Sequence, residues 1–130
     1  GVPGGHRPVK RSGSCIRDYA YIDDVVAAFL TAGIKEEVLT GQHYVIGSGV
    51  GWSIEDTINL IADRAGMKTG HTTSVDLNDE EPLESAEWRN FVADSSSFES
   101  ATGWRHNTSL IDGIDQTIDF FIDELAKAQV

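Results

Sequence analysis

The sequence predicts a single α/β domain with a few short strands and three main helices. Apolar residues recur at helical spacing in three long segments, and capping residues and glycines mark the ends of these segments. Short runs of high β-propensity lie between them. The chain of 130 residues is long enough for one domain with a modest core, and it contains no internal repeat. We therefore expect one domain over 1–130.

Residues 1–14 are rich in glycine and proline, and we expect them to form a loop or a tail left from a longer chain. The chain begins with Gly1, and Met67 is its only methionine. These two features lead us to expect a fragment or a processed product rather than a chain that starts at its own initiation codon.

The first predicted strand covers 15–22, where residues alternate between two faces. Asp23 or Asp24 is the expected N-cap of the helix that follows, because a short carboxylate accepts from the N–H groups of a first helical turn. Gly33 closes this helix, since glycine tolerates the backbone angles beyond a last turn. The apolar residues at helical spacing are Val25, Val26, Phe29 and Leu30.

The second long helix is predicted to begin after Ser53. Asp56 follows three places later in the manner of a capping box, and Gly66 is the expected end. The apolar stripe of this helix supports the assignment, because its members recur every three or four residues. They are Ile54, Ile58, Ile61 and Ala65.

The C-terminal part of the chain contains a brief helix and the last long helix. Asp94 is the predicted cap of the brief helix, which ends near Gly103. Ser109 opens the last helix, whose apolar face extends over 109–126. Further strands are predicted at 42–46, 72–76 and 90–93, and an acidic loop at 77–87.

The chain has a formal net charge of -11, and this charge argues against two classes of partner. An acidic surface repels both nucleic acid and anionic membrane. No apolar run approaches the roughly 20 residues of a membrane span. The single cysteine, Cys15, excludes an internal disulfide framework and is compatible with the cytoplasm. We expect Cys15 to be a packing residue, because no histidine lies near it in the sequence.

The glycine-rich run 47–52 lies between a predicted strand and a helix and imitates a dinucleotide-binding loop. In such loops a glycine or alanine stands at the third position, where the helix packs closely on the strand. Trp52 stands there instead, and an indole does not fit that gap. We therefore interpret the run as a turn that uses glycines for their permissive backbone angles.

No metal ligand and no catalytic residue is predicted. The four histidines are scattered, and the carboxylates of 76–87 lack the ligand order of a calcium loop, so we expect a solvated acidic segment. None of the three tyrosines has a lysine four residues later, although a proton-shuttling tyrosine usually needs a nearby cation. These tyrosines are Tyr19, Tyr21 and Tyr44.

Arg17 admits two interpretations from its residue type and position. An arginine on a rigid strand is a good clamp for phosphate, because its planar fork of donors matches phosphate oxygens and keeps its charge. It can equally be a strand-edge residue paired with a local acid such as Asp18 or Asp24. The residue pattern alone does not choose between these interpretations.

Four stretches carry a resemblance to a known family, and they occur in the family's order. Residues 13–26 resemble the pattern GDGxxxRDFVYVDDVV, and 44–49 with the following Ser-Ile resemble YNIGSG. Residues 91–96 are similar to FVADTSK, and 103–114 resemble LGWxPxTSLEEGL. The chain thus resembles the C-terminal substrate-binding part of an extended short-chain dehydrogenase/reductase, the group of NAD-dependent nucleotide-sugar epimerases and dehydratases.

The resemblance implies a nucleotide-sugar site. In the family the arginine at Arg17 contacts the diphosphate, and Val9 and Lys10 correspond to residues that line the base pocket. The family's second arginine is replaced here by Glu84, which would repel a diphosphate. Arg89 lies close in sequence and is a candidate replacement. The remaining candidate site residue is Glu87, at the position of the family's aspartate near a ribose hydroxyl.

The resemblance also implies what this chain lacks. The NAD(P)-binding Rossmann half and its Tyr-x-x-x-Lys pair belong to an N-terminal part that is not in this sequence. We therefore expect no cofactor in the fragment, no turnover by it alone, and a homodimeric intact enzyme. The apolar faces of 24–33 and 109–126 are expected to cover the larger domain. The alternatives are a catalytically silent interaction module of the same fold and part of an extended-family reductase acting on another substrate.

Overall fold

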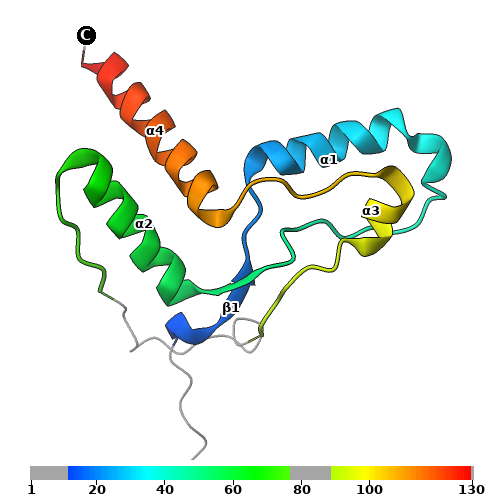
Figure 1. Ribbon diagram of the computed structural model, residues 1–130, viewed down its shortest axis with the longest axis horizontal. Coiled ribbons are helices and arrows are strands. Elements are labelled where there is room, and N and C mark those ends of the chain that lie inside the picture. Colours follow the sequence, from blue (N-terminus) through cyan, green and yellow to red (C-terminus); the bar gives the residue numbers. More distant parts are fainter. Residues whose placement is uncertain (1–11, 77–88, 130) are drawn as a thin grey trace, which may run out of the picture.

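The computed structural model describes residues 12–76 and 89–129, and Figure 1 shows their arrangement. The predicted α/β class with three main helices is confirmed. A small two-stranded sheet lies at the centre, with α2 and α4 to one side of it and α1 and α3 to the other. The elements in chain order are η1 (Ser12–Ser14), β1 (Ile16–Asp18), α1 (Ile22–Ile34), η2 (Glu36–Val38), β2 (Gly51–Ser53), α2 (Ile54–Thr69), α3 (Ser96–Thr102) and α4 (Leu110–Ala128).

The sheet is shorter than the sequence predicts. β1 and β2 are antiparallel and three residues long each, and Arg17 lies opposite Trp52 in the register. On the other edge of β1 the N–H of Phe91 donates to the carbonyl of Ile16 at 3.0 Å. The strand prediction over 15–22 is wrong beyond Asp18, because residues 19–21 form no strand and α1 begins at Ile22.

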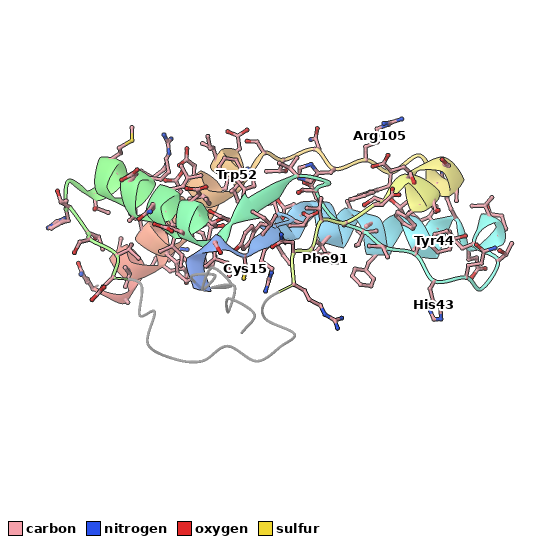
Figure 2. All side chains as sticks on the ribbon, turned by 90° about the horizontal axis from the view of Figure 1, so that it is seen from below. Cys15, His43, Tyr44, Trp52, Phe91 and Arg105 are labelled. Carbon is pink, nitrogen blue, oxygen red and sulfur yellow. The ribbon has the colours of Figure 1, made fainter. Side chains whose placement is uncertain are left out.

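The strands predicted at 42–46, 72–76 and 90–93 are not formed. A strand needs a partner for its backbone groups, and β-propensity does not supply one. In 42–46 the side chain of Tyr44 packs on Phe98 instead, with ring centroids 5.8 Å apart. Figure 2 shows Tyr44 turned toward α3 while the adjacent His43 points outward.

α1 begins at Ile22, earlier than either predicted cap allows. Tyr21 is its N-cap and makes no side-chain cap bond, so the prediction of Asp23 or Asp24 as N-cap is wrong. The carboxylate of Asp24 is buried and accepts instead from the N–H groups of Asn107 at 3.3 Å and Thr108 at 2.9 Å. Asp24 therefore fastens the loop before α4 to the start of α1.

The predicted caps of the two other long helices are confirmed. The hydroxyl of Ser53 accepts from the N–H of Asp56 at 3.0 Å, and that of Ser109 accepts from Asp112 at 3.1 Å. α2 continues past the predicted end at Gly66 and stops before Gly70, which has φ 74°. Ion pairs between Arg64 and Asp115 and between Lys68 and Asp119 join α2 to α4.

The clearest apolar core lies between α1 and α3. Ala28, Phe98 and Trp104 are buried together there, and the rings of Phe98 and Trp104 are 5.7 Å apart. α3 ends at Gly103 as predicted, but its N-cap is Ser95, while Asp94 accepts from the N–H of Ser96 at 3.0 Å. Cys15 is buried, which agrees with the packing role predicted for it.

The outer face of α1 is apolar and exposed. Phe29 is 70% exposed and Ile34 is 77% exposed, and the helix carries no charged residue between Asp24 and Lys35. A helix of this composition is normally covered by other protein. The large apolar side chains that α1 exposes are Ile22, Val26, Phe29, Leu30 and Ile34, and those that α4 exposes are Ile111, Phe120, Phe121 and Leu125.

Candidate functional site

The guanidinium of Arg17 contacts the backbone of Arg89 at one edge of the central sheet. Arg17 lies in the middle of β1 and is half-buried. Its Nη1 donates to the carbonyl of Ile16 at 2.9 Å and to the carbonyl of Arg89. Arg89 is exposed. Of the sequence-predicted site residues, the structure thus brings these two together, while Val9, Lys10 and Glu87 lie outside the described residues.

The segment that carries Arg89 is fastened along β1. The side-chain oxygen of Asn90 accepts from the N–H of Ile16 at 2.9 Å, and the N–H of Phe91 donates to the carbonyl of Ile16 at 3.0 Å. These bonds hold the backbone on which the guanidinium of Arg17 rests. Cationic groups held in this way lose less conformational entropy when they bind an anion.

Asp18 is the hub of a polar junction made by β1, the loop 47–49 and the segment 89–93. Its Oδ1 accepts from the N–H of Ser48 at 2.8 Å and from the hydroxyl of Ser48 at 2.5 Å. Its Oδ2 accepts from the N–H of Gly49 at 2.9 Å and of Ala93 at 3.0 Å. One carboxylate therefore joins three segments that are far apart in the sequence.

The surroundings of Asp18 favour its charged form. Partial burial raises the pKa of this carboxyl, but the hydrogen bonds from Ser48, Ala93 and Gly49 together outweigh burial and hold the pKa below its ordinary value. Asp18 is therefore an ionised acceptor at neutral pH. The sequence reasoning missed this role, because its partners are 30 and 75 residues away.

The glycine loop is a turn, as predicted, and its glycines make room for Asp18. A Cβ on Gly47 would lie 2.4 Å from the Cβ of Ala93 and 2.8 Å from Oδ2 of Asp18. Gly49 has φ 74°, which L side chains rarely adopt. The N–H groups of this loop that resemble a phosphate cradle are already bonded to an internal carboxylate, so the loop does not fit a dinucleotide.

The three tyrosines lie in apolar surroundings. Tyr19 and Tyr21 line an apolar pocket of about 240 Å³ between α2 and α4, together with Ile61 and Ile114. Tyr44 belongs to the core under α1 and α3. Among residues 12–76 and 89–129 no cluster of three or more His, Cys, Asp or Glu side chains is placed to hold a metal ion. In the same part of the chain no helix is long and apolar enough to cross a membrane.

Two curated proteins are similar to this chain over most of its length. A UDP-glucose 4-epimerase of Mycolicibacterium smegmatis is 31% identical over 109 residues, which are 84% of this chain and 32% of the relative. A putative GDP-L-fucose synthase 2 of Arabidopsis thaliana is 26% identical over 116 residues, which are 89% of this chain and 32% of the relative. The chain thus spans about a third of the length of these relatives. No profile of a known protein family matches it.

Solved structures give the same result for the fold. The UDP-glucose 4-epimerase of Thermotoga maritima, solved with UDP-glucose, matches with TM-score 0.63 and 25% identity over 87% of this chain and 33% of that one. The Bordetella bronchiseptica enzyme WbmF, solved with NAD+ and UDP, matches with TM-score 0.61 and 25% identity over 94% of this chain and 33% of that one. The relatives and the solved structures thus support the resemblance of this chain to the C-terminal part of extended short-chain dehydrogenase/reductases.

Proposed function

We propose that this chain is the nucleotide-sugar-binding portion of an NAD-dependent nucleotide-sugar epimerase or dehydratase. The observation that carries the proposal is the seating of the Arg17 guanidinium against the backbone of Arg89. This contact puts the side chain of Arg17 beside the backbone of a second arginine in an acidic chain. The relatives support the ligand class, because one is a UDP-glucose 4-epimerase and two similar structures were solved with UDP-glucose or UDP.

The chemistry proposed for the site is diphosphate binding. Arg17 offers a planar set of donors that match phosphate oxygens, and Arg89 supplies a second positive charge where the family's usual second arginine is replaced by Glu84. Val9 and Lys10 remain the proposed wall of the base pocket. Glu87 remains the proposed ribose contact.

This chain alone is proposed to be inactive. NAD(P) would provide hydride transfer in the intact enzyme, but the residues described here do not fit it, since Asp18 fills the glycine loop. The 130 residues also contain no Tyr-x-x-x-Lys pair. We assign cofactor binding to an N-terminal Rossmann half, whose contact surface includes the exposed face of α1. The intact protein is proposed to be a homodimer in the cytoplasm.

The test is a titration of the ¹⁵N-labelled chain with UDP, UDP-glucose and GDP, followed by amide shifts. We expect shifts at Arg17 and at 89–91, and their loss in Arg17→Ala. The matched control is Arg105→Ala, because Arg105 is an exposed arginine that projects from the edge of the molecule away from Phe91 (Figure 2). This control should bind like the parent chain. Conversion of UDP-glucose by the chain with added NAD would contradict the proposed inactivity.

A second candidate function is a catalytically silent interaction module that keeps the fold but not the ligand. The exposed apolar face of α1 favours it, because such faces bind other protein surfaces. The titration separates the two candidates. Absence of any localised shift at millimolar nucleotide would favour the module and count against the binding site at Arg17.

A further inference from the structure

We propose that Asp18 is a positioning residue that sets the place of the Arg17 guanidinium. The inference deepens the proposed function and rests on it for the ligand, but its geometry stands on contacts within this chain. Asp18 and Arg17 are neighbours on β1, so their side chains leave opposite faces of the strand. On one face of β1, Asp18 bonds to the loop 47–49 and to Ala93. The side chain of Arg17 leaves the other face.

The connection between the two residues runs through the segment 89–93. One end of this segment provides the carbonyl of Arg89, which accepts from Nη1 of Arg17. The other end provides the N–H of Ala93, which donates to Oδ2 of Asp18 at 3.0 Å. The carboxylate of Asp18 thus anchors one end of a short backbone segment whose other end seats the guanidinium of Arg17.

The loop 47–49 makes this anchor rigid. Ser48 donates twice to Oδ1 of Asp18, and the hydroxyl of Ser95 accepts from the N–H of Gly47 at 2.9 Å. Ser95 follows Ala93 closely in the sequence, so the loop and the segment 89–93 are locked to each other as well as to Asp18. Loss of the charge on Asp18 would leave three converging backbone N–H groups without their anionic acceptor and would loosen the segment that seats Arg17.

The experiment compares Asp18→Asn with Asp94→Asn in the full chain. Asp94 is a fair control, because its carboxylate also accepts a backbone N–H, that of Ser96, and because it directly follows Ala93 in the sequence. The first readout is the ¹⁵N–¹H signal of the Arg17 Nε group without any ligand. We expect Asp18→Asn to move this signal toward that of a solvated arginine and Asp94→Asn to leave it in place. Ser48→Ala removes the hydroxyl that donates to Oδ1 of Asp18 and that also bonds to the backbone of Val50, and it keeps the three backbone donors to Asp18. It should move the signal by an intermediate amount.

The second readout is a double-mutant cycle on UDP affinity. Asp18→Asn is expected to weaken UDP binding about tenfold, and to have no further effect in the Arg17→Ala background. Additive losses, or an Arg17 signal unchanged in folded Asp18→Asn, would overturn the inference and leave Asp18 a purely structural residue. If the parent chain binds no UDP, the proposed function fails, while the ligand-free signal of Arg17 still decides the role of Asp18.

Discussion

The polar junction around Asp18 has its hydrogen bonds formed within this chain, whereas the apolar outer face of α1 is left uncovered by it. In the junction the carboxylate of Asp18 accepts four hydrogen bonds, and its neighbours Gly47 and Ala93 are buried. On α1 the apolar side chains point to solvent, and Phe29 is 70% exposed. The same small chain therefore contains one region whose polar groups are hydrogen-bonded and one region whose apolar side chains are exposed to solvent.

The difference shows which properties belong to this chain and which depend on a partner. Buried polar groups are costly unless every donor has an acceptor, so a satisfied junction is a defined structure in its own right. Exposed apolar area, by contrast, favours binding to another surface, because its removal from water is favourable. The contacts that hold Arg17 form within this chain, whereas the apolar face of α1 is exposed and suited to cover by other protein. Four predictions test this comparison.

The largest effect is expected for Gly47→Ala. The new Cβ would lie 2.4 Å from the Cβ of Ala93 and 2.8 Å from Asp18, and both neighbours are fixed. We expect the free energy of unfolding to fall by about 3 kcal/mol, because overpacking of a tight site forces backbone shifts. Urea unfolding measures this change. Gly33→Ala on α1 is the control, since its Cβ meets nothing within 4 Å, and it should leave stability unchanged or raise it by up to about 1 kcal/mol.

The second effect concerns the buried carboxylate of Asp24. Asp24→Ala removes the acceptor of the N–H groups of Asn107 and Thr108, and it should cost about 2 kcal/mol of unfolding free energy. Asp23→Ala is the matched control, because Asp23 lies in the same helical turn but is exposed, and its effect should stay within about 0.5 kcal/mol. Equal losses in the two variants would show that the carboxylates act only as charges at the start of α1.

The third effect is a dependence of stability on pH through Asp18. The pKa of this group is lower in the folded chain than in the unfolded chain. Its contribution is therefore present above the unfolded pKa of about 4 and is lost as the pH falls through the lower folded pKa. Asp18→Asn should lose about 1 kcal/mol at pH 7, because the group is partly solvated. Urea midpoints at pH 7 and pH 3 should then differ less in this variant than in the parent chain.

The helices could be predicted from sequence because their signals are local. Ser53 and Ser109 each bond to an N–H three residues later, and Gly103 has the positive φ expected after a last turn. A glycine alone does not fix where a helix ends: Gly66 lies inside α2, because the following residues continue the helical backbone bonds to Thr69. The caps of α1 were misassigned, since the partners of Asp24 are more than 80 residues away.

The strands and the junction could be predicted only in part, because their partners are distant. Residues 42–46 have strand propensity, but they pair with no strand in the described part of the chain, whereas β1 pairs with 51–53. Arg17 was identified as a candidate from its residue type and from the family pattern. For Asp18 the sequence indicates only a local acid, because nothing near it shows that Ser48, Gly49 and Ala93 converge on it.

Phe29→Glu is expected to have the smallest effect on stability. It is also the most direct test of the exposed apolar face of α1. Because Phe29 is mostly exposed, the substitution should change the unfolding free energy by no more than about 0.5 kcal/mol. The parent chain should self-associate through α1 at the concentrations used for NMR, and the variant should be monomeric by sedimentation equilibrium. Asn59→Glu adds the same charge at an exposed position of α2 and should leave self-association intact. A parent chain that is monomeric and binds no hydrophobic dye would contradict this prediction. The face of α1 would then be stable in water, and its contrast with the junction around Asp18 would not indicate a missing partner.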